Sequence, residues 1–105
     1  MSAQIAASDV FAAISAPARR EILRVLANGE MPMQTIAASF SMSVPGVSQH
    51  LAVLLDAGLV SVRKDGRQRI YSLNARPLKD VAAWVQEYEK YVFIDYMLAF
   101  LTVEQ

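Results

Sequence analysis

The chain has 105 residues, of which 54% are hydrophobic, and its ten Lys and Arg residues balance ten Asp and Glu residues. It holds no cysteine, which excludes disulfides, thiolate metal sites and thiol redox sensing. No stretch reaches the roughly 18 apolar residues of a membrane span, and the first 18 residues lack the basic start of a secretory signal. We therefore expect one cytoplasmic domain over residues 1–105, with no cofactor, no bound metal and no membrane contact.

Three short helices are predicted in the first forty residues. Residues 4–14 place apolar side chains at near-helical spacing: Ile5, Val10, Phe11 and Ile14. Pro17 suits the first turn of a second helix, which Asn28 and Gly29 would end. Its inward stripe comprises Ile22, Leu23 and Leu26, with Val25 beside them. A third helix is expected over residues 33–40, with Ile36, Ala37 and Phe40 turned inward.

Residues 43–57 predict a fourth helix with two different faces. Its packing face is expected to contain Val47, Leu51, Leu54 and Leu55. Ser43 is a favourable N-cap, and the outer face carries small or hydrogen-bonding side chains that leave room for a DNA major groove. The residues expected near DNA are Ser43, Val44, Pro45, Gly46, Ser48, Gln49 and His50. Taken alone, this pattern favours an ordinary amphipathic helix whose polar side meets water. The short helix before it and the basic hairpin after it favour DNA.

His50 is the only histidine of the chain. One imidazole in a chain without cysteine cannot anchor an ordinary zinc site, and no nucleophile beside it indicates catalysis. His50 borders the packing face, so we interpret it as a half-buried, hydrogen-bonded side chain, with a phosphate contact as the sharper alternative. We expect no enzymatic activity.

Residues 59–73 change to an alternating period and predict a β-hairpin. Asp65-Gly66 is a strong signal for a two-residue type I′ turn, which would pair Val62 with Arg69 and Val60 with Tyr71. The apolar residues expected to share one face of the hairpin and pack against the helices are Val60, Val62, Tyr71 and Leu73. The hairpin is basic, and the cations expected at DNA phosphates are Arg63, Lys64, Arg67 and Arg69. The alternative is a solvated hairpin that protects its sheet edge with charge. Arg19, Arg20 and Arg24 are equally compatible with ion pairing and with phosphate contact.

A last helix is expected from Pro77 to residue 101. Residues 91–101 contain one charge, Asp95, and so small a domain cannot easily cover a helix that is apolar all round. We therefore predict a homodimer rather than a purely internal core. The residues expected at its interface are Val10, Phe11, Trp84, Tyr88, Tyr91, Val92, Tyr96 and Phe100.

The segments 14–30, 43–60 and 63–74, together with Trp84, resemble the ArsR-type winged-helix repressors over about residues 9 to 88. The resemblance implies a mainly α fold with a β-hairpin wing, in the order four helices, hairpin, helix. It also implies a homodimer that binds an inverted-repeat operator and represses transcription. By this resemblance residues 43–57 form the recognition helix and residues 63–69 the wing, while the first and last helices dimerise.

Three departures from that pattern stand out. The helix before the recognition helix lacks the thiols that many relatives use to sense metals, and the last helix has no histidine. The sequence is therefore similar to the branch that does not sense metals. Ala16 replaces the Asp that often caps the second helix, which costs about 0.5–2 kcal/mol unless Ser15 substitutes.

The leading hypothesis is thus a dimeric, sequence-specific repressor that binds double-stranded DNA. A winged-helix module that binds a protein through the same surface is the alternative from another class. A third hypothesis adds an apolar small-molecule effector at the dimer interface, beside Trp84, Tyr88 or Phe93. The sequence does not identify the operator, the regulated genes or the effector.

Overall fold

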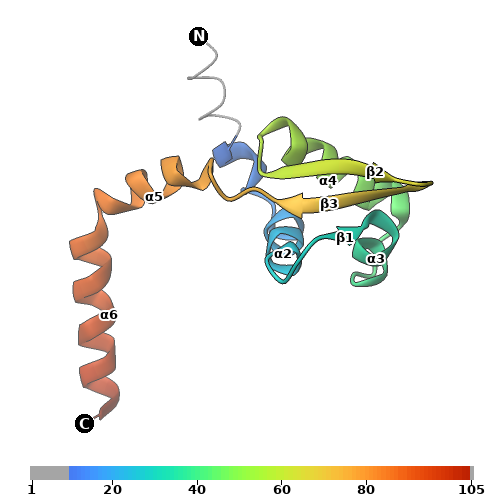
Figure 1. Cartoon of the computed structure of the whole chain (residues 1–105). Helices are drawn as coiled ribbons and strands as arrows, with labels where there is room; N and C mark the ends of the chain where they lie inside the picture. Colours follow the sequence, from blue (N-terminus) through green and yellow to red (C-terminus); the bar gives the residue numbers. More distant parts are fainter. Residues whose placement is uncertain (1–9, 105) are drawn as a thin grey trace.

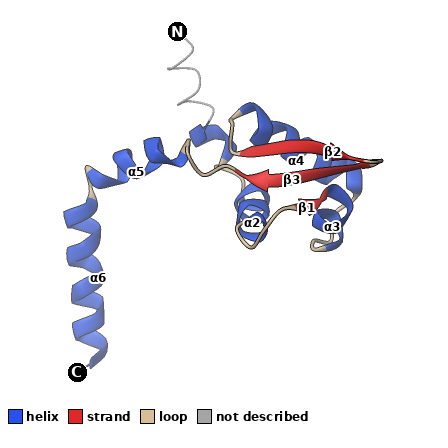
Figure 2. Cartoon of the chain, viewed as in Figure 1, coloured by secondary structure: helices blue, strands red, loops and turns tan. Residues whose placement is uncertain are grey.

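The computed structural model describes residues 10–104, apart from the side chains at 96, 100 and 102–104. After a helical turn at residues 10–13, the helices are α2 (Pro17–Leu26), α3 (Met33–Ala38), α4 (Val44–Asp56), α5 (Leu78–Gln86) and α6 (Glu89–Glu104). The strands are β1 (Met31–Pro32), β2 (Val60–Asp65) and β3 (Gln68–Leu73). Figures 1 and 2 show α4 behind the long β2–β3 hairpin, with α2 and α3 on the β1 side of the sheet. The predicted mainly α fold with a hairpin wing is confirmed. Ile5 lies outside the described residues.

The sheet is antiparallel in the order β1-β3-β2, and its turn differs from the prediction. The central turn residues are Gly66 and Arg67, and among the described non-glycine residues none has positive φ. Gly66, at φ +65°, therefore occupies the first central position, as in a type II′ turn. Val62 consequently pairs with Tyr71 rather than Arg69, and Val60 with Leu73. The register prediction was wrong by two residues, a shift that keeps every side chain on its predicted face.

The core lies between α2, α3, α4 and one face of the sheet. Fully buried side chains come from all four elements, among them Ile22, Ile36, Val47, Leu51, Leu54 and Val60. Two predictions of burial were wrong. Leu55 and Val62 are 40% and 39% exposed, because Leu55 lies beside rather than on the buried stripe of α4 and Val62 lies towards the hairpin tip.

The start of α2 lacks a side-chain cap. Pro17 occupies the first turn as predicted, and Ala16 makes no capping hydrogen bond. Ser15 does not substitute, because its hydroxyl donates to the Ala12 carbonyl at 2.7 Å. Other contacts therefore have to fix the junction between the first helical turn and α2.

The predicted last helix is two helices, α5 and α6, with a break at residues 87–88. They leave the domain as an arm, and α6 turns sharply away from α5 (Figure 1). The radius of gyration is 16.9 Å, against about 13 Å for a compact domain of this length. No helix in the described part of the chain is long and apolar enough to cross a membrane. Many apolar side chains of this arm are at least half exposed, among them Trp84, Tyr91, Phe93 and Leu101.

Candidate nucleic-acid interface

Ser43 caps the first turn of α4. Its hydroxyl accepts a hydrogen bond from the Gly46 N–H at 3.2 Å, which confirms it as the N-cap. On the next turn Gln49 is exposed, while Ser48 and His50 are half-buried. Val47, Leu51 and Leu54 of the same helix are fully buried, whereas each of the predicted recognition residues is exposed or half-buried.

His50 is held by an arginine of α2. Arg19 Nε donates to the Ala13 carbonyl at 2.6 Å, and its Nη2 to the Ala12 carbonyl at 3.3 Å. Its Nη1 lies 3.3 Å from His50 Nδ1. Because a guanidinium can only donate, Nδ1 is the acceptor and the ring proton belongs on Nε2. The sequence prediction of a hydrogen-bonded boundary histidine therefore agrees with the structure, although nothing in the sequence pointed to Arg19 as its partner.

The three arginines of α2 are engaged within the protein. Arg20 Nη1 donates to the carbonyls of Ile14 and Ser15, at 2.9 and 3.3 Å. Arg19 and Arg20 thus satisfy carbonyls at the end of the first helical turn, where cations are favoured. Arg24 pairs with Glu21 at 3.4 Å. These contacts favour a structural role over phosphate contact for Arg19 and Arg20.

A hollow of about 250 Å³ separates the start of α4 from the wing tip. Its walls come from the start of α3, the first residue of α4 and the end of the hairpin: Pro32, Met33, Gln34, Val44, Arg67, Gln68 and Arg69. Gln34 was not predicted as a site residue, because only the fold brings the start of α3 to this place. Two of the predicted wing cations, Arg67 and Arg69, therefore line the same hollow as the first residue of α4.

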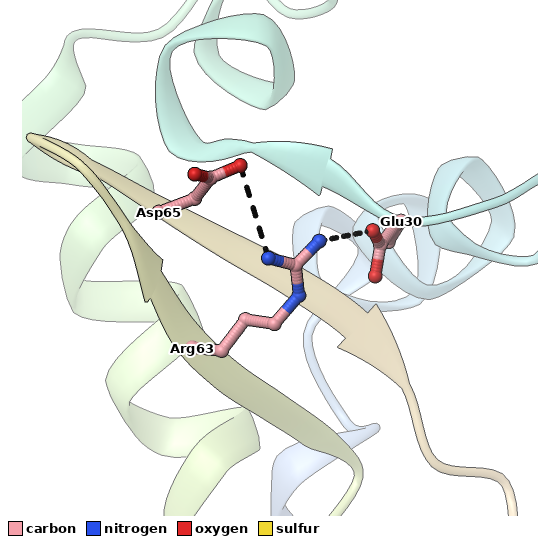
Figure 3. A network of polar contacts seen from close by, with 3 residues as sticks. All are labelled: Glu30, Arg63 and Asp65. Atoms are coloured by element: carbon pink, nitrogen blue, oxygen red, sulfur yellow. Dashed lines mark hydrogen bonds and ion pairs between the residues drawn. The ribbon is translucent and has the colours of Figure 1, made fainter.

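The four wing cations are not equivalent. Arg63 Nη2 donates to Glu30 at 2.5 Å, and its Nη1 lies 3.9 Å from Asp65 (Figure 3). The hydrogen bond and charge of Glu30, helped by Asp65, raise the pKa of Arg63 above its ordinary value. Among the described residues, Lys64, Arg67 and Arg69 form no ion pair. They are therefore the cations available to an outside anion.

The predicted interface residues lie on the arm and, for Val10 and Phe11, in the first helical turn. Phe11 meets Trp84 edge-on with ring centroids 6.0 Å apart, and Trp84 meets Tyr88 in the same way at 5.4 Å. Tyr91 and Val92 are 61% and 58% exposed. Val10 is buried within the protomer and offers no surface to a partner in this conformation. The side chains of Tyr96 and Phe100 are not among those that the structure describes.

Across residues 10–104, no three His, Cys, Asp or Glu side chains gather closely enough to hold an ion.

The fold and the site together define the class of this protein. Two helices are joined by a short turn, and a hairpin that carries cations lies beside the second helix. This arrangement is a winged helix-turn-helix.

The comparisons with known proteins are specific. A family model described as bacterial regulatory protein, arsR family, matches residues 16–62. The transcriptional repressor SdpR of Bacillus subtilis is 41% identical over 78 residues, which cover 74% of this chain and 87% of the relative. The arsenical resistance operon repressor of Staphylococcus aureus is 36% identical over 74 residues, which cover 70% and 71% of the two chains.

A similar solved structure is the homodimeric winged helix-turn-helix DNA-binding domain from Mycobacterium bovis. It has a TM-score of 0.70 and 26% identity, and covers 88% of this chain and 85% of its own. The chain belongs to the ArsR family of bacterial regulatory proteins and is a transcriptional regulator of the winged helix-turn-helix class.

Proposed function

We propose that this regulator is a homodimeric repressor that acts in the cytoplasm by binding an inverted repeat in double-stranded DNA. The observation that carries the proposal is the hollow between α4 and the wing, because it brings Val44, the first residue of α4, next to Arg67 and Arg69. A duplex that places its major groove on α4 would bring a phosphate strand towards those cations.

The parts of this surface have separate roles. Gln49 is exposed and can form two hydrogen bonds with an adenine edge, and Ser48 beside it can contact a base or a phosphate. Ser43, Val44, Pro45 and Gly46 form the first turn of α4. Pro45 has no N–H and the Gly46 N–H is bonded to Ser43, so the N–H that could meet a phosphate there is that of Val44. His50 would present Nε2–H to the same strand. Lys64, Arg67 and Arg69 would supply the attraction that does not depend on sequence.

Dimerisation would place two such surfaces about one helical turn of DNA apart, roughly 34 Å. The arm supports it, because many of its aromatic and aliphatic side chains are about half exposed, from 42% for Val85 to 62% for Phe93. The relative from Mycobacterium bovis is homodimeric. The interface of this chain would include Phe11, Trp84, Tyr88, Tyr91, Val92, Tyr96 and Phe100, whereas the predicted Val10 is buried within the protomer.

Selection of bound duplexes from a random DNA pool tests the proposal. We expect enrichment of an inverted repeat whose half-sites are about one turn apart. Gln49→Ala should weaken binding to the selected site by about 1–3 kcal/mol and relax preference at one position in each half-site. Asn28→Ala removes an exposed amide just after α2, outside α4, the wing and the arm; it is the matched control and should leave both properties unchanged.

Two outcomes would count against the proposal. A pool that yields no enriched sequence would refute sequence-specific binding. Enrichment of sites that Gln49→Ala binds with unaltered affinity and preference would refute the role of Gln49 and leave binding itself intact.

A further inference from the structure

We propose that Arg63 does not contact DNA but is a positioning residue, which ties the wing to the helix-turn-helix through Glu30. The inference rests on the proposed DNA-binding function and divides the four wing cations into one tether and three phosphate contacts. It starts from the ion pair in Figure 3, whose partners are 33 residues apart in the chain.

The ion pair crosses the middle strand of the sheet. Arg63 belongs to β2 and Glu30 precedes β1, while β3 runs between these two strands. In register, Ile70 of β3 lies between Arg63 and Pro32, and it is 7% exposed. The guanidinium therefore links the two outer strands on the sheet face that carries Ile70.

The ion pair between Arg63 and Glu30 lies beside β1, the shortest strand of the sheet. β1 has two residues, Met31 and Pro32, and proline has no N–H to donate to a neighbouring strand. This strand leads directly into α3, whose packing on α4 sets the position of the recognition helix. An ion pair across β3 therefore adds a second connection between the wing and the helices where strand pairing is minimal.

Local charge makes Arg63 a poor phosphate ligand. It shares its surroundings with two carboxylates, Glu30 and Asp65, so a phosphate that approached it would meet a net negative charge. Lys64 and Arg69 pair across the hairpin and, because side chains alternate, lie on the opposite face. Of the described carboxylates, none pairs with either cation. The hairpin thus has one cationic face and one self-neutralised face.

A double-mutant cycle in DNA binding tests this division. The four proteins are the wild type, Arg63→Gln, Glu30→Gln and the double variant, measured on one duplex over a range of salt concentrations. Arg63→Gln should weaken binding about two- to fivefold, the range expected for an exposed ion pair, and should have almost no further effect once Glu30 is Gln. Its salt slope should equal that of the wild type, whereas Arg67→Gln should lower the slope by about 0.9.

Two further measurements complete the test: amide exchange of the protein without DNA, and rescue by a charge swap. Amide hydrogen exchange at residues 31, 70 and 71 should accelerate equally in Arg63→Gln and Glu30→Gln. The charge swap Glu30→Arg with Arg63→Glu should restore slow exchange and most of the affinity, since it rebuilds the ion pair. A DNA contact would not survive that swap.

Three results would contradict the expected ones, and each has its own meaning. If Arg63→Gln lowers the salt slope as much as Arg67→Gln, and its effect grows when Glu30 is Gln, then Arg63 binds phosphate and the inference is wrong. Additive effects together with unchanged amide exchange would also overturn it. If the wild type binds no duplex, the proposed function fails, and the exchange measurement alone decides whether the tether exists.

Discussion

Tyr91 offers a quantitative test of the arm as a dimer interface. Its side chain is 61% exposed, so about 120 Å² of an aromatic residue of roughly 200 Å² is available for burial. At about 25 cal/mol per Å², and in line with aromatic hot spots, Tyr91→Ala should cost about 2–3 kcal/mol for each copy. A symmetric dimer contains two copies, so the dimer Kd should rise by about 10³–10⁴-fold.

Sedimentation velocity over a wide range of protein concentration measures this Kd. Alanine has a higher helix propensity than tyrosine, so α6 itself should not be weakened. Leu55→Ala is the matched control, because Leu55 is 40% exposed and belongs to α4 rather than to α5 or α6. The reasoning would be refuted if Tyr91→Ala dimerised as tightly as Leu55→Ala, or if the wild type remained monomeric at every concentration.

Three further predictions concern the domain. Leu51→Ala removes a fully buried side chain of α4 and should lower the free energy of unfolding in urea by about 2–5 kcal/mol, whereas Val53→Ala, at a 39% exposed position, should change it by less than about 1 kcal/mol. Ser43→Ala removes the N-cap of α4 and should cost about 1 kcal/mol in the same assay, while an equal loss in Ser41→Ala would contradict the capping role. Zn²⁺ or a chelator should leave DNA affinity unchanged, because the chain has no cysteine and one histidine; a metal-dependent loss of binding would show that an unrecognised site exists.

Much of the helical domain was predictable because its signals are local. Ser43 at the start of α4 and the spacing of Val47, Leu51 and Leu54 correctly gave the cap and the buried face. Leu55 failed for a physical reason. Helical periodicity gives the direction of a side chain, but it does not say how wide a stripe the neighbouring elements cover.

The hairpin shows where local chemistry is ambiguous. An Asp-Gly pair fits a type I′ turn, while Gly alone in the first central position fits type II′, and both turns lie within one short stretch. The resulting error of two residues left Val60 and Tyr71 on the buried face, because strand side chains alternate with period two.

The contacts that depend on distant residues could not be predicted. β1 is too short to give a sequence pattern, and only its pairing with β3 defines it. The same holds for Glu30 with Arg63 and for Arg19 with His50, which join residues more than thirty positions apart. The sequence therefore predicted which residues carry charge, but not which charges the fold uses internally.

The contacts of Arg19 have a consequence for how a change at the N-terminal end of the domain reaches DNA. One guanidinium is shared by the carbonyls of Ala12 and Ala13 and by the imidazole of His50. If the helical turn at residues 10–13 moved, Arg19 would lose the acceptors at Ala12 and Ala13 together. Phe11 belongs to that turn and contacts Trp84, so in the proposed dimer a change in subunit packing that moved the turn would reach His50 of α4 through Arg19.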